Sequence, residues 1–283
     1  MARNNDTAVF SVIFPENQPF FEEFTQSLLK QTRTDFDLVL LNDGLSSIPD
    51  CFNGLNCKVF NAKENLAKTR QLGLQILIEE GYEQVIFADS DDLLSENRVE
   101  VSLTLLEKAD LIANDLNLIN QKGELFLEGF WKDRIPNHTE IDASFIRDKN
   151  IFGLGNSAAK GSFLKNLNIP ETLKVVDWYI FLNLLTQDHR ALFTSDTYTH
   201  YRIRPGNLGS FGEVNELSVY RCLQVKKQYY GLMATESEYY SDKLASILQI
   251  EEQLEDENVL RKFVDNRSKE ITNPFWWEEV MEN

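Results

Sequence analysis

The sequence predicts an α/β fold in which helices flank a mixed, mostly parallel sheet. Short apolar runs rich in β-branched and aromatic residues alternate with segments of helical periodicity over the first 110 residues. Each run ends in a polar turn, and the 283 residues are 42% hydrophobic and 26% charged, as in an ordinary globular protein. Strands that alternate with helices form largely parallel sheets, and ligands bind beyond the carboxyl ends of their strands. We therefore expect the functional side chains at that edge.

Four buried strands are predicted in the first 90 residues. Each is a short apolar run bounded by polar or turn-forming residues, and the first is stopped by Pro15. The fourth leads directly into the acidic sequence ADSDD. The four runs are AVFSVIF (8–14), FDLVLLNDG (36–44), CKVFNA (57–62) and QVIF (84–87).

Two helices are predicted between these strands. The first begins at Pro19, which suits a first helical turn, after an expected loop at 15–19. The second covers NLAKTRQLGLQILIEEG (65–81), where the final glycine ends the helix. The apolar stripe of the first helix consists of Phe20, Phe24 and Leu28.

The alternation becomes looser beyond about residue 110. One helix, DWYIFLNLLTQ (177–187), has apolar residues at i, i+3, i+4 and i+7, which places Asp177 at its N-terminal edge. The pattern is helical from 213 to 270, and an acidic segment with Phe275, Trp276 and Trp277 follows. Further strands are predicted at 110–119, 123–130 and 197–203.

Composition argues against several classes of partner. The formal net charge is −17 and the isoelectric point is near 4.6, which disfavours nucleic acid as the main ligand. The sequence has no apolar stretch long enough to cross a bilayer, and its start, MARNNDTA, lacks the layout of a signal peptide, so we expect a cytoplasmic protein. The three cysteines form no CxxC pair and are expected to be reduced thiols.

The acidic triplet in FADSDDLL is the strongest candidate for chemistry. Asp89, Asp91 and Asp92 follow a buried strand at the ligand-binding edge, and three ionised carboxylates so close together favour a divalent cation. Mg²⁺ or Mn²⁺ would take carboxylate oxygens and complete its shell with water or phosphate oxygens. The structural alternative is a solvated turn in which Asp92 or Ser95 caps the helix expected at 95–108.

Three further charged residues have both a functional and a structural interpretation. Asp43 follows the second strand and either forms an Asp-Gly turn or accepts hydrogen bonds from a base or ribose. Arg70 is either solvated or placed for a base or pyrophosphate. Asp177 either stabilises a helix N-terminus or acts as a general base. Of the three histidines, none with metal-ligand spacing, His200 is nearest to the expected site.

Four stretches together resemble the family 2 glycosyltransferases, which have the GT-A fold. FSVIFPENQPFFEEFTQSLLKQTRTDFDLVLLNDGLSS is similar to the opening strand, helix and second strand of that family. NLAKTRQLGLQ resembles its arginine-bearing helix, FADSDDLL its DxD metal-binding region, and VVDWYIFLNLL the helix with its catalytic base. The resemblance covers roughly residues 8 to 205, in a consistent order and spacing.

This resemblance implies sugar transfer from a nucleotide donor, usually a UDP-sugar, to an acceptor hydroxyl with inversion at the anomeric carbon. It assigns Asp177 as the base and Mn²⁺ or Mg²⁺ as the cofactor. The acceptor would be a saccharide or a lipid-linked molecule, as in the synthesis of polysaccharides or glycoconjugates. The implied nucleotide-sugar-binding residues are Pro15, Asp43, Arg70, Asp89 and Ser90, the metal ligands Asp89, Asp91 and Asp92, and the acceptor-side residues Asn156, Trp178 and His200.

The resemblance also implies a division of the chain. Residues 1–212 would form the GT-A domain, with a nucleotide-sugar-binding half at about 1–118 and an acceptor half at 119–212. Residues 213–283 would form a C-terminal helical extension, which offers a surface for a homodimer. Its aromatic end could touch the inner face of a membrane, but NPFWWEEVMEN has no basic face to hold anionic lipid, which favours packing instead.

Two other functions remain open on sequence grounds. Asn42 and Val176 stand where the family commonly has acidic residues, which is compatible with a non-catalytic GT-A-like module that binds nucleotides. VIFADSDDLL is also similar to the start of haloacid-dehalogenase phosphatases, in which the first aspartate is a nucleophile. That class normally has a later Gly-Asp metal motif, which this sequence does not contain.

Overall fold

The computed structural model describes residues 5–165, 167–187, 189–204, 214–235, 237–270 and 272–280. The chain divides into two compact units. The first consists of Met1–Ala143, Phe152–Thr172 and Val176–Arg204, and the second of Ser144–Ile151, Leu173–Val175 and Pro205–Asn283. The second unit is therefore discontinuous in sequence. The boundary expected between 212 and 213 lies outside the described residues.

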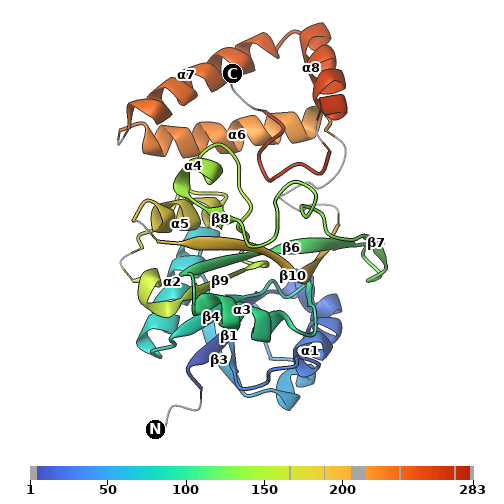
Figure 1. Ribbon diagram of the computed structural model, residues 1–283, viewed down its shortest axis with the longest axis vertical. Helices are drawn as coiled ribbons and strands as arrows, with labels where there is room; N and C mark the ends of the chain where they lie inside the picture. The colour runs from blue at the N-terminus through green and yellow to red at the C-terminus, as the bar shows by residue number, and fades with distance from the viewer. Residues whose placement is uncertain are drawn as a thin grey trace. The chain divides into compact units, whose positions relative to one another are not determined.

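The first unit is built on one ten-stranded mixed sheet (Figure 1). Its main path runs β3-β2-β1-β4-β9-β6-β10-β5, while β7 pairs with β6 and β8 with β10. The predicted mixed α/β fold is confirmed. The strands are β1 (Thr7–Ile13), β2 (Asp37–Asp43), β3 (Cys57–Ala62), β4 (Gln84–Phe87), β5 (Leu93–Leu94), β6 (Leu111–Ile119), β7 (Leu125–Leu127), β8 (Glu140–Ile141), β9 (Ser157–Lys160) and β10 (Ala191–Arg202).

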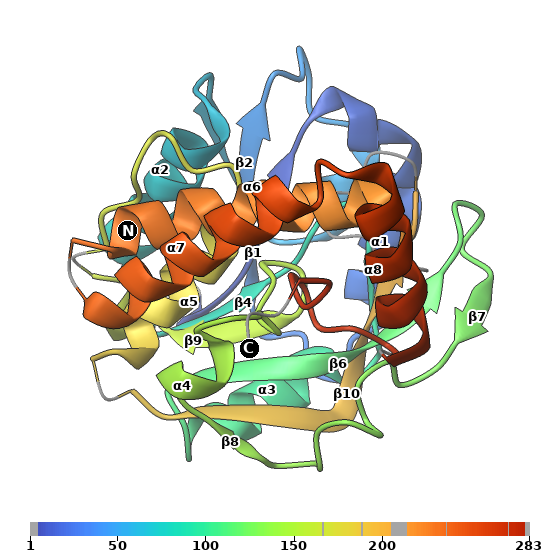
Figure 2. The same ribbon diagram turned by 90° about the horizontal axis from the view of Figure 1, so that it is seen from above.

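The four strands predicted first form one parallel part of the sheet. β1 pairs in parallel with both β2 and β4, and β2 with β3. All seven residues of β1 are buried, which fits a strand covered on both faces and explains its continuous apolar sequence. In contrast, β9 pairs antiparallel with both β4 and β6, and β6 lies beside β10 in parallel (Figure 2). The sequence did not predict β9, β5 or β8.

The helices of the first unit lie near the predicted positions, with two corrections. The segment expected to be a loop at 15–19 is a 3-10 helix, which includes Pro19, and the α-helix begins after it. Neither Asp92 nor Ser95 caps α3, because Asn97 occupies the cap position without a side-chain hydrogen bond. The elements are η1 (Pro15–Phe20), α1 (Phe21–Leu29), η2 (Asp50–Gly54), α2 (Leu66–Glu79), α3 (Arg98–Leu106), η3 (Gly161–Leu164) and α5 (Val176–Leu185).

The second unit contains three long helices, α6 (Glu216–Met233), α7 (Glu238–Gln253) and α8 (Glu257–Glu270), and α6 packs against the other two (Figure 1). The short α4 (Ala143–Ile146) leads into the segment 144–151, where Asp148 accepts hydrogen bonds from Tyr230 of α6 and Tyr239 of α7. The backbone of Asn150 pairs with that of Trp276, which is buried together with its aromatic neighbours at 275 and 277. Among the described residues, no helix is both long and apolar enough to span a bilayer.

Candidate active site

The parallel strands bring the predicted polar residues to one edge of the sheet. Ile13 at the end of β1 is in register with Asn42 of β2, and Phe10 is in register with Phe87 of β4. Because these strands run in the same direction, the segments that follow them leave the sheet at the same side. The segments are η1 after β1, the Asp43 turn after β2 and the acidic loop 89–92 after β4.

Ser90 fixes the acidic loop to the end of β1. Its side chain is fully buried, its hydroxyl donates a hydrogen bond to the Val12 carbonyl at 3.0 Å, and it accepts one from Asn17 Nδ2 at 3.0 Å. Asn17 itself is buried in η1. The resemblance implies that Ser90 binds the nucleotide-sugar, which stays a prediction, and in this structure its hydroxyl holds the loop in place.

Asp91 is held by a cation and an amide. Its Oδ2 forms an ion pair with Arg204 Nη2 at 2.7 Å, and its Oδ1 accepts a hydrogen bond from Asn17 Nδ2 at 3.1 Å. Arg204 also donates to Asn17 Oδ1 at 2.7 Å, so the three side chains form a closed cluster. Burial raises the pKa of the Asp91 carboxyl, and the positive charge of Arg204 opposes that rise. The sequence singled out neither Asn17 nor Arg204.

Asp89 and Asp92 direct oxygens towards the same small volume beside Gly155. A β-carbon built on Gly155 would lie 2.8 Å from Asp89 Oδ2 and 3.1 Å from Asp92 Oδ2. Asp92 Oδ1 accepts the backbone N–H of Arg202 at 2.8 Å. Its Oδ2 is buried and has no hydrogen-bond partner in the described part of the chain. Burial raises the pKa of Asp89 to about 6 and that of Asp92 well above its usual value, with the charge of Asp91 adding to both shifts.

These features fit a divalent cation held by few protein ligands. A buried carboxylate oxygen without a partner is costly, and a hard cation beside it would remove that cost. Over the described ranges, no group of three or more His, Cys, Asp or Glu side chains is arranged as a metal cage. Both observations agree if one or two carboxylates bind the ion and substrate oxygens supply the rest, as is usual for Mg²⁺. The predicted participation of Asp91 would require a change in its pairing with Arg204.

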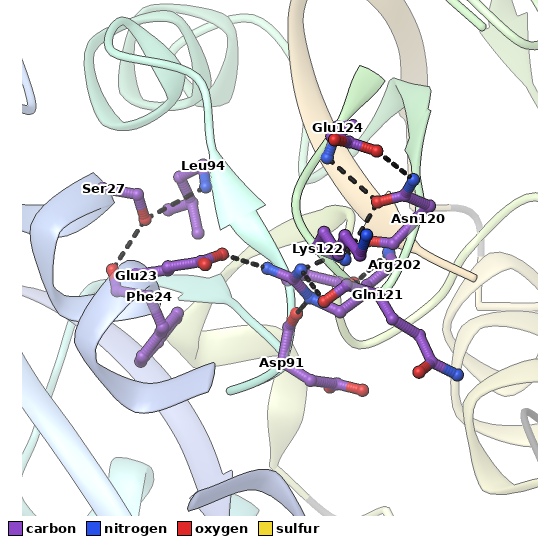
Figure 3. A network of polar contacts seen from close by, with 11 residues as sticks. Glu23, Phe24, Ser27, Asp91, Leu94, Asn120, Gln121, Lys122, Glu124 and Arg202 are labelled. Atoms are coloured by element: carbon purple, nitrogen blue, oxygen red, sulfur yellow. Dashed lines mark hydrogen bonds and ion pairs between the residues drawn. The ribbon is translucent and has the colours of Figure 1, made fainter. Parts of the chain in front are cut away.

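Arg202 braces the acidic loop from the side of β10 (Figure 3). The guanidinium is fully buried, and its Nε donates to the Asp91 carbonyl at 2.7 Å. Nη1 donates to the carbonyls of Asn120 and Gln121, and Nη2 pairs with Glu23 of α1 at 2.6 Å. One side chain thus joins the loop to the β6–β7 turn and to α1. Residue 202 is buried out of phase with Thr197 and Thr199 of β10, so the alternation of the strand did not indicate it.

Arg70 is the electrostatic link between the remaining predicted residues. Its positive charge lowers the pKa of Asp43, Asp89 and Asp177, each of which burial raises. Asp177 lies in the first turn of α5, is partly exposed, and accepts the backbone N–H of Trp178 at 3.1 Å. Burial raises its pKa to about 6. The structure therefore brings Arg70 into the neighbourhood of all three carboxylates.

Two of the three acceptor-side residues have structural roles in this structure. Asn156 is buried, accepts the Gly153 N–H at 2.7 Å and donates to the Asn114 carbonyl at 2.8 Å. Trp178 is 1% exposed and belongs to the core. His200 is only partly buried, and its burial lowers its pKa. Contact between any of these residues and an acceptor stays a prediction.

Pro15 and Asn42 shape the loops near Asp43. Pro15 is exposed, and its ring lies 3.7 Å from the position of a β-carbon on Gly44, whose φ of +102° favours glycine. Asn42 accepts the Leu45 N–H at 2.9 Å and donates to the Leu45 carbonyl at 2.9 Å. The asparagine at position 42 therefore has a structural explanation, because its amide closes the turn.

The chain has sequence similarity to glycosyltransferases over part of its length. No protein-family model matches it. An uncharacterized glycosyltransferase of Rickettsia conorii is 31% identical over 132 residues, which are 42% of this chain and 21% of that protein. One from Rickettsia felis is 30% identical over 112 residues, 36% of this chain and 18% of the relative. The matched region thus spans about a fifth of the length of these relatives.

Solved structures resemble most of the chain. TarS of S. aureus, residues 1–349 in complex with UDP-GlcNAc, matches with a TM-score of 0.56 at 18% identity, over 78% of this chain and 65% of that one. The mannosyltransferase PcManGT of Pyrobaculum calidifontis, in complex with GDP-Man and Mn²⁺, matches with a TM-score of 0.58 at 14% identity, over 82% of this chain and 65% of that one. The curled mixed sheet flanked by helices is therefore the fold of the GT-A glycosyltransferases.

Proposed function

We propose that this protein is an inverting glycosyltransferase that moves a sugar from a UDP-linked donor to an acceptor hydroxyl. The observation that carries the proposal is the gathering of the acidic loop, Arg70 and Asp177 at the carboxyl edge of a GT-A sheet. Nucleotide-sugar complexes of proteins with the same fold, one with UDP-GlcNAc and one with GDP-Man and Mn²⁺, support this class of donor.

In the proposed reaction, Asp177 is the general base. Its carboxylate accepts the proton of the acceptor hydroxyl as that oxygen forms a bond to the anomeric carbon and the bond from this carbon to the diphosphate breaks. One carboxylate oxygen is oriented by the Trp178 N–H, and a pKa near 6 leaves the group ionised at neutral pH but more basic than an exposed aspartate. Because base and leaving group lie on opposite sides of the sugar, a single displacement inverts the anomeric configuration.

The arginine whose charge acts on this base also suits the donor. Arg70 carries a positive charge close to Asp43, Asp89 and Asp177. A nucleotide diphosphate would add negative charge beside these carboxylates, so its binding needs the positive charge of Arg70 and an added cation. A divalent ion, Mn²⁺ or Mg²⁺, would be held by carboxylates among Asp89, Asp91 and Asp92 and would stabilise the negative charge of the departing diphosphate. Asp43, the last residue of β2, would accept hydrogen bonds from the nucleoside.

A ligand panel tests the proposal. We would measure the thermal stability of the protein with UDP, GDP, TDP or CMP, each with and without Mn²⁺, because a ligand that binds the native state raises stability by mass action. We expect the largest rise with UDP and Mn²⁺ together. If no nucleotide gave a metal-dependent rise, the assignment of donor and metal would be wrong. Binding without transfer to any acceptor would instead favour the non-catalytic module.

A further inference from the structure

Arg204 forms an ion pair with the acidic loop. Its Nη2 lies 2.7 Å from Asp91 Oδ2, and the two side chains are 21% and 13% exposed. Its guanidinium also lies 5.5 Å from the centre of the Phe20 ring. A charge pair this poorly exposed is screened less by water and salt than a surface pair, so it holds the Asp91 carboxylate firmly.

The three carboxylates of the loop are paired unequally. Asp91 has Arg204 and Asn17 as partners. Asp92 Oδ2 has no partner within the described segments, and Asp89 Oδ2 faces the same volume beside Gly155. A cation that enters there would meet two carboxylates that form no ion pair within the described segments and a third that is already paired with Arg204. To bind Asp91 as well, the cation must displace Arg204 from the Asp91 carboxylate.

We propose that Arg204 and the divalent cation compete for Asp91. This inference rests on the proposed function, which assigns the cation. Without metal, Arg204 neutralises Asp91 and keeps the loop from accumulating unpaired negative charge. When the cation binds, it replaces Arg204 at Asp91, and the guanidinium is released from that carboxylate. Arg204 is thus a positioning residue that acts through Asp91 and sets the affinity for the metal.

A double-mutant cycle on Mn²⁺ affinity tests this competition. Mn²⁺ binding is measured by the loss of the free-ion signal in electron paramagnetic resonance, with the full chain and no nucleotide. We expect Arg204→Gln to bind Mn²⁺ roughly tenfold more tightly than the unaltered protein, because Asp91 becomes available. In an Asp91→Asn background, the same arginine substitution should change the affinity by less than about twofold. Arg204→Lys keeps the charge and should lie between the two, which provides a second variant if the glutamine form folds poorly.

The Asp91→Asn background distinguishes competition for Asp91 from a general effect of the charge of Arg204. If Arg204 acted only through its electric field, its removal would tighten Mn²⁺ binding equally with aspartate or asparagine at position 91. Arg33→Gln removes the same charge from an exposed pair with Asp35 and should leave Mn²⁺ affinity unchanged. Equal affinities of the unaltered and Arg204→Gln proteins, an equal gain in both backgrounds, or no Mn²⁺ binding by any form would each overturn the inference. Since no nucleotide is present, these results are independent of the donor panel.

Discussion

At the scale of single residues, the environment of Asp177, the proposed general base, predicts how sugar transfer should depend on pH. Burial raises the pKa of this carboxyl to about 6, and a base acts only when it is deprotonated. We therefore expect kcat to rise with pH up to about 6 and to level off above it. Asp177→Asn should lower kcat by about 10²- to 10⁴-fold and remove this limb of the profile. Both are measured by initial rates of sugar transfer at saturating donor.

A matched substitution controls for effects of charge on the profile. Glu171 is exposed and pairs with Lys68 at the surface, so Glu171→Gln should leave both the rate and the profile unchanged. Full transfer activity in Asp177→Asn would show that another group takes the proton.

Gly155 is the residue whose substitution tests the geometry of the acidic loop. A methyl group there would lie 2.8 Å from Asp89 Oδ2, closer than a β-carbon normally approaches an oxygen, so the carboxylates must move. We expect Gly155→Ala to weaken Mn²⁺ binding at least about tenfold, with a loss of about 1–3 kcal/mol in unfolding free energy. Isothermal titration and urea unfolding measure the two effects. Gly231→Ala is the control, because a β-carbon there meets nothing within 4 Å, and unchanged metal binding in Gly155→Ala would contradict the placement of the metal.

Some of these residues were predicted from the sequence because ligands bind at the carboxyl ends of parallel strands. Asp43, Asp89 and the rest of the acidic loop follow parallel strands, and the ends of such strands meet at one edge. Asn17, Gly155 and Arg204 were not predicted, because their importance comes from contacts with residues far away in sequence. An asparagine 74 positions from its aspartate partner carries no local pattern that reveals the pair.

At the scale of elements, β9 shows why part of the sheet escaped prediction. Its sequence, SAAK, is four residues long and has neither β-branched nor aromatic side chains. It is a strand because β4 and β6 provide antiparallel partners on both sides, with Ala158 and Ala159 fully buried between them. The small alanine side chains allow neighbouring elements to pack closely over β9. The strand propensity of SAAK alone does not predict a strand here. By contrast, β1 and β2 were predicted because their own composition is sufficient.

The junction between β9 and η3 should be intolerant of any side chain. A β-carbon on Gly161 would lie 2.0 Å from the backbone oxygen of Tyr82, and the Gly161 N–H donates to the Glu83 carbonyl at 2.8 Å. Because the obstacle is backbone, it cannot rotate away, so we expect Gly161→Ala to lower the free energy of unfolding by about 2–4 kcal/mol. Urea denaturation measures this loss. Gly54→Ala, whose β-carbon would make an ordinary 3.5 Å contact with Leu29, should change stability by less than about 1 kcal/mol.

At the scale of the whole molecule, the charge distribution separates the site from the rest of the chain. The chain has a net charge of −17, which disfavours binding to nucleic acid. Even so, Arg70, Arg202 and Arg204 gather around the acidic loop. Global composition argues against nucleic acid as the main ligand, but it could not locate these arginines. Their positions depend on α2 and on the end of β10, which the sequence indicated only as separate elements.

The discontinuity of the second unit predicts the behaviour of a shortened chain. Segments 144–151 and 173–175 belong to that unit, and Asp148 and Asn150 bond to residues that follow position 204. A chain that ends at Arg204 would lose these partners and expose apolar residues such as Ile146 and Ile151, which are fully buried in the full chain. We expect this fragment to melt at a lower temperature and to bind a hydrophobic dye such as ANS, as measured by scanning calorimetry and fluorescence. Asp148→Asn in the full chain should show a smaller change in the same direction, because it weakens the contacts of Asp148 and leaves those of Asn150 intact. A fragment with unchanged melting and no dye binding would instead show that the first unit folds independently of everything after position 204.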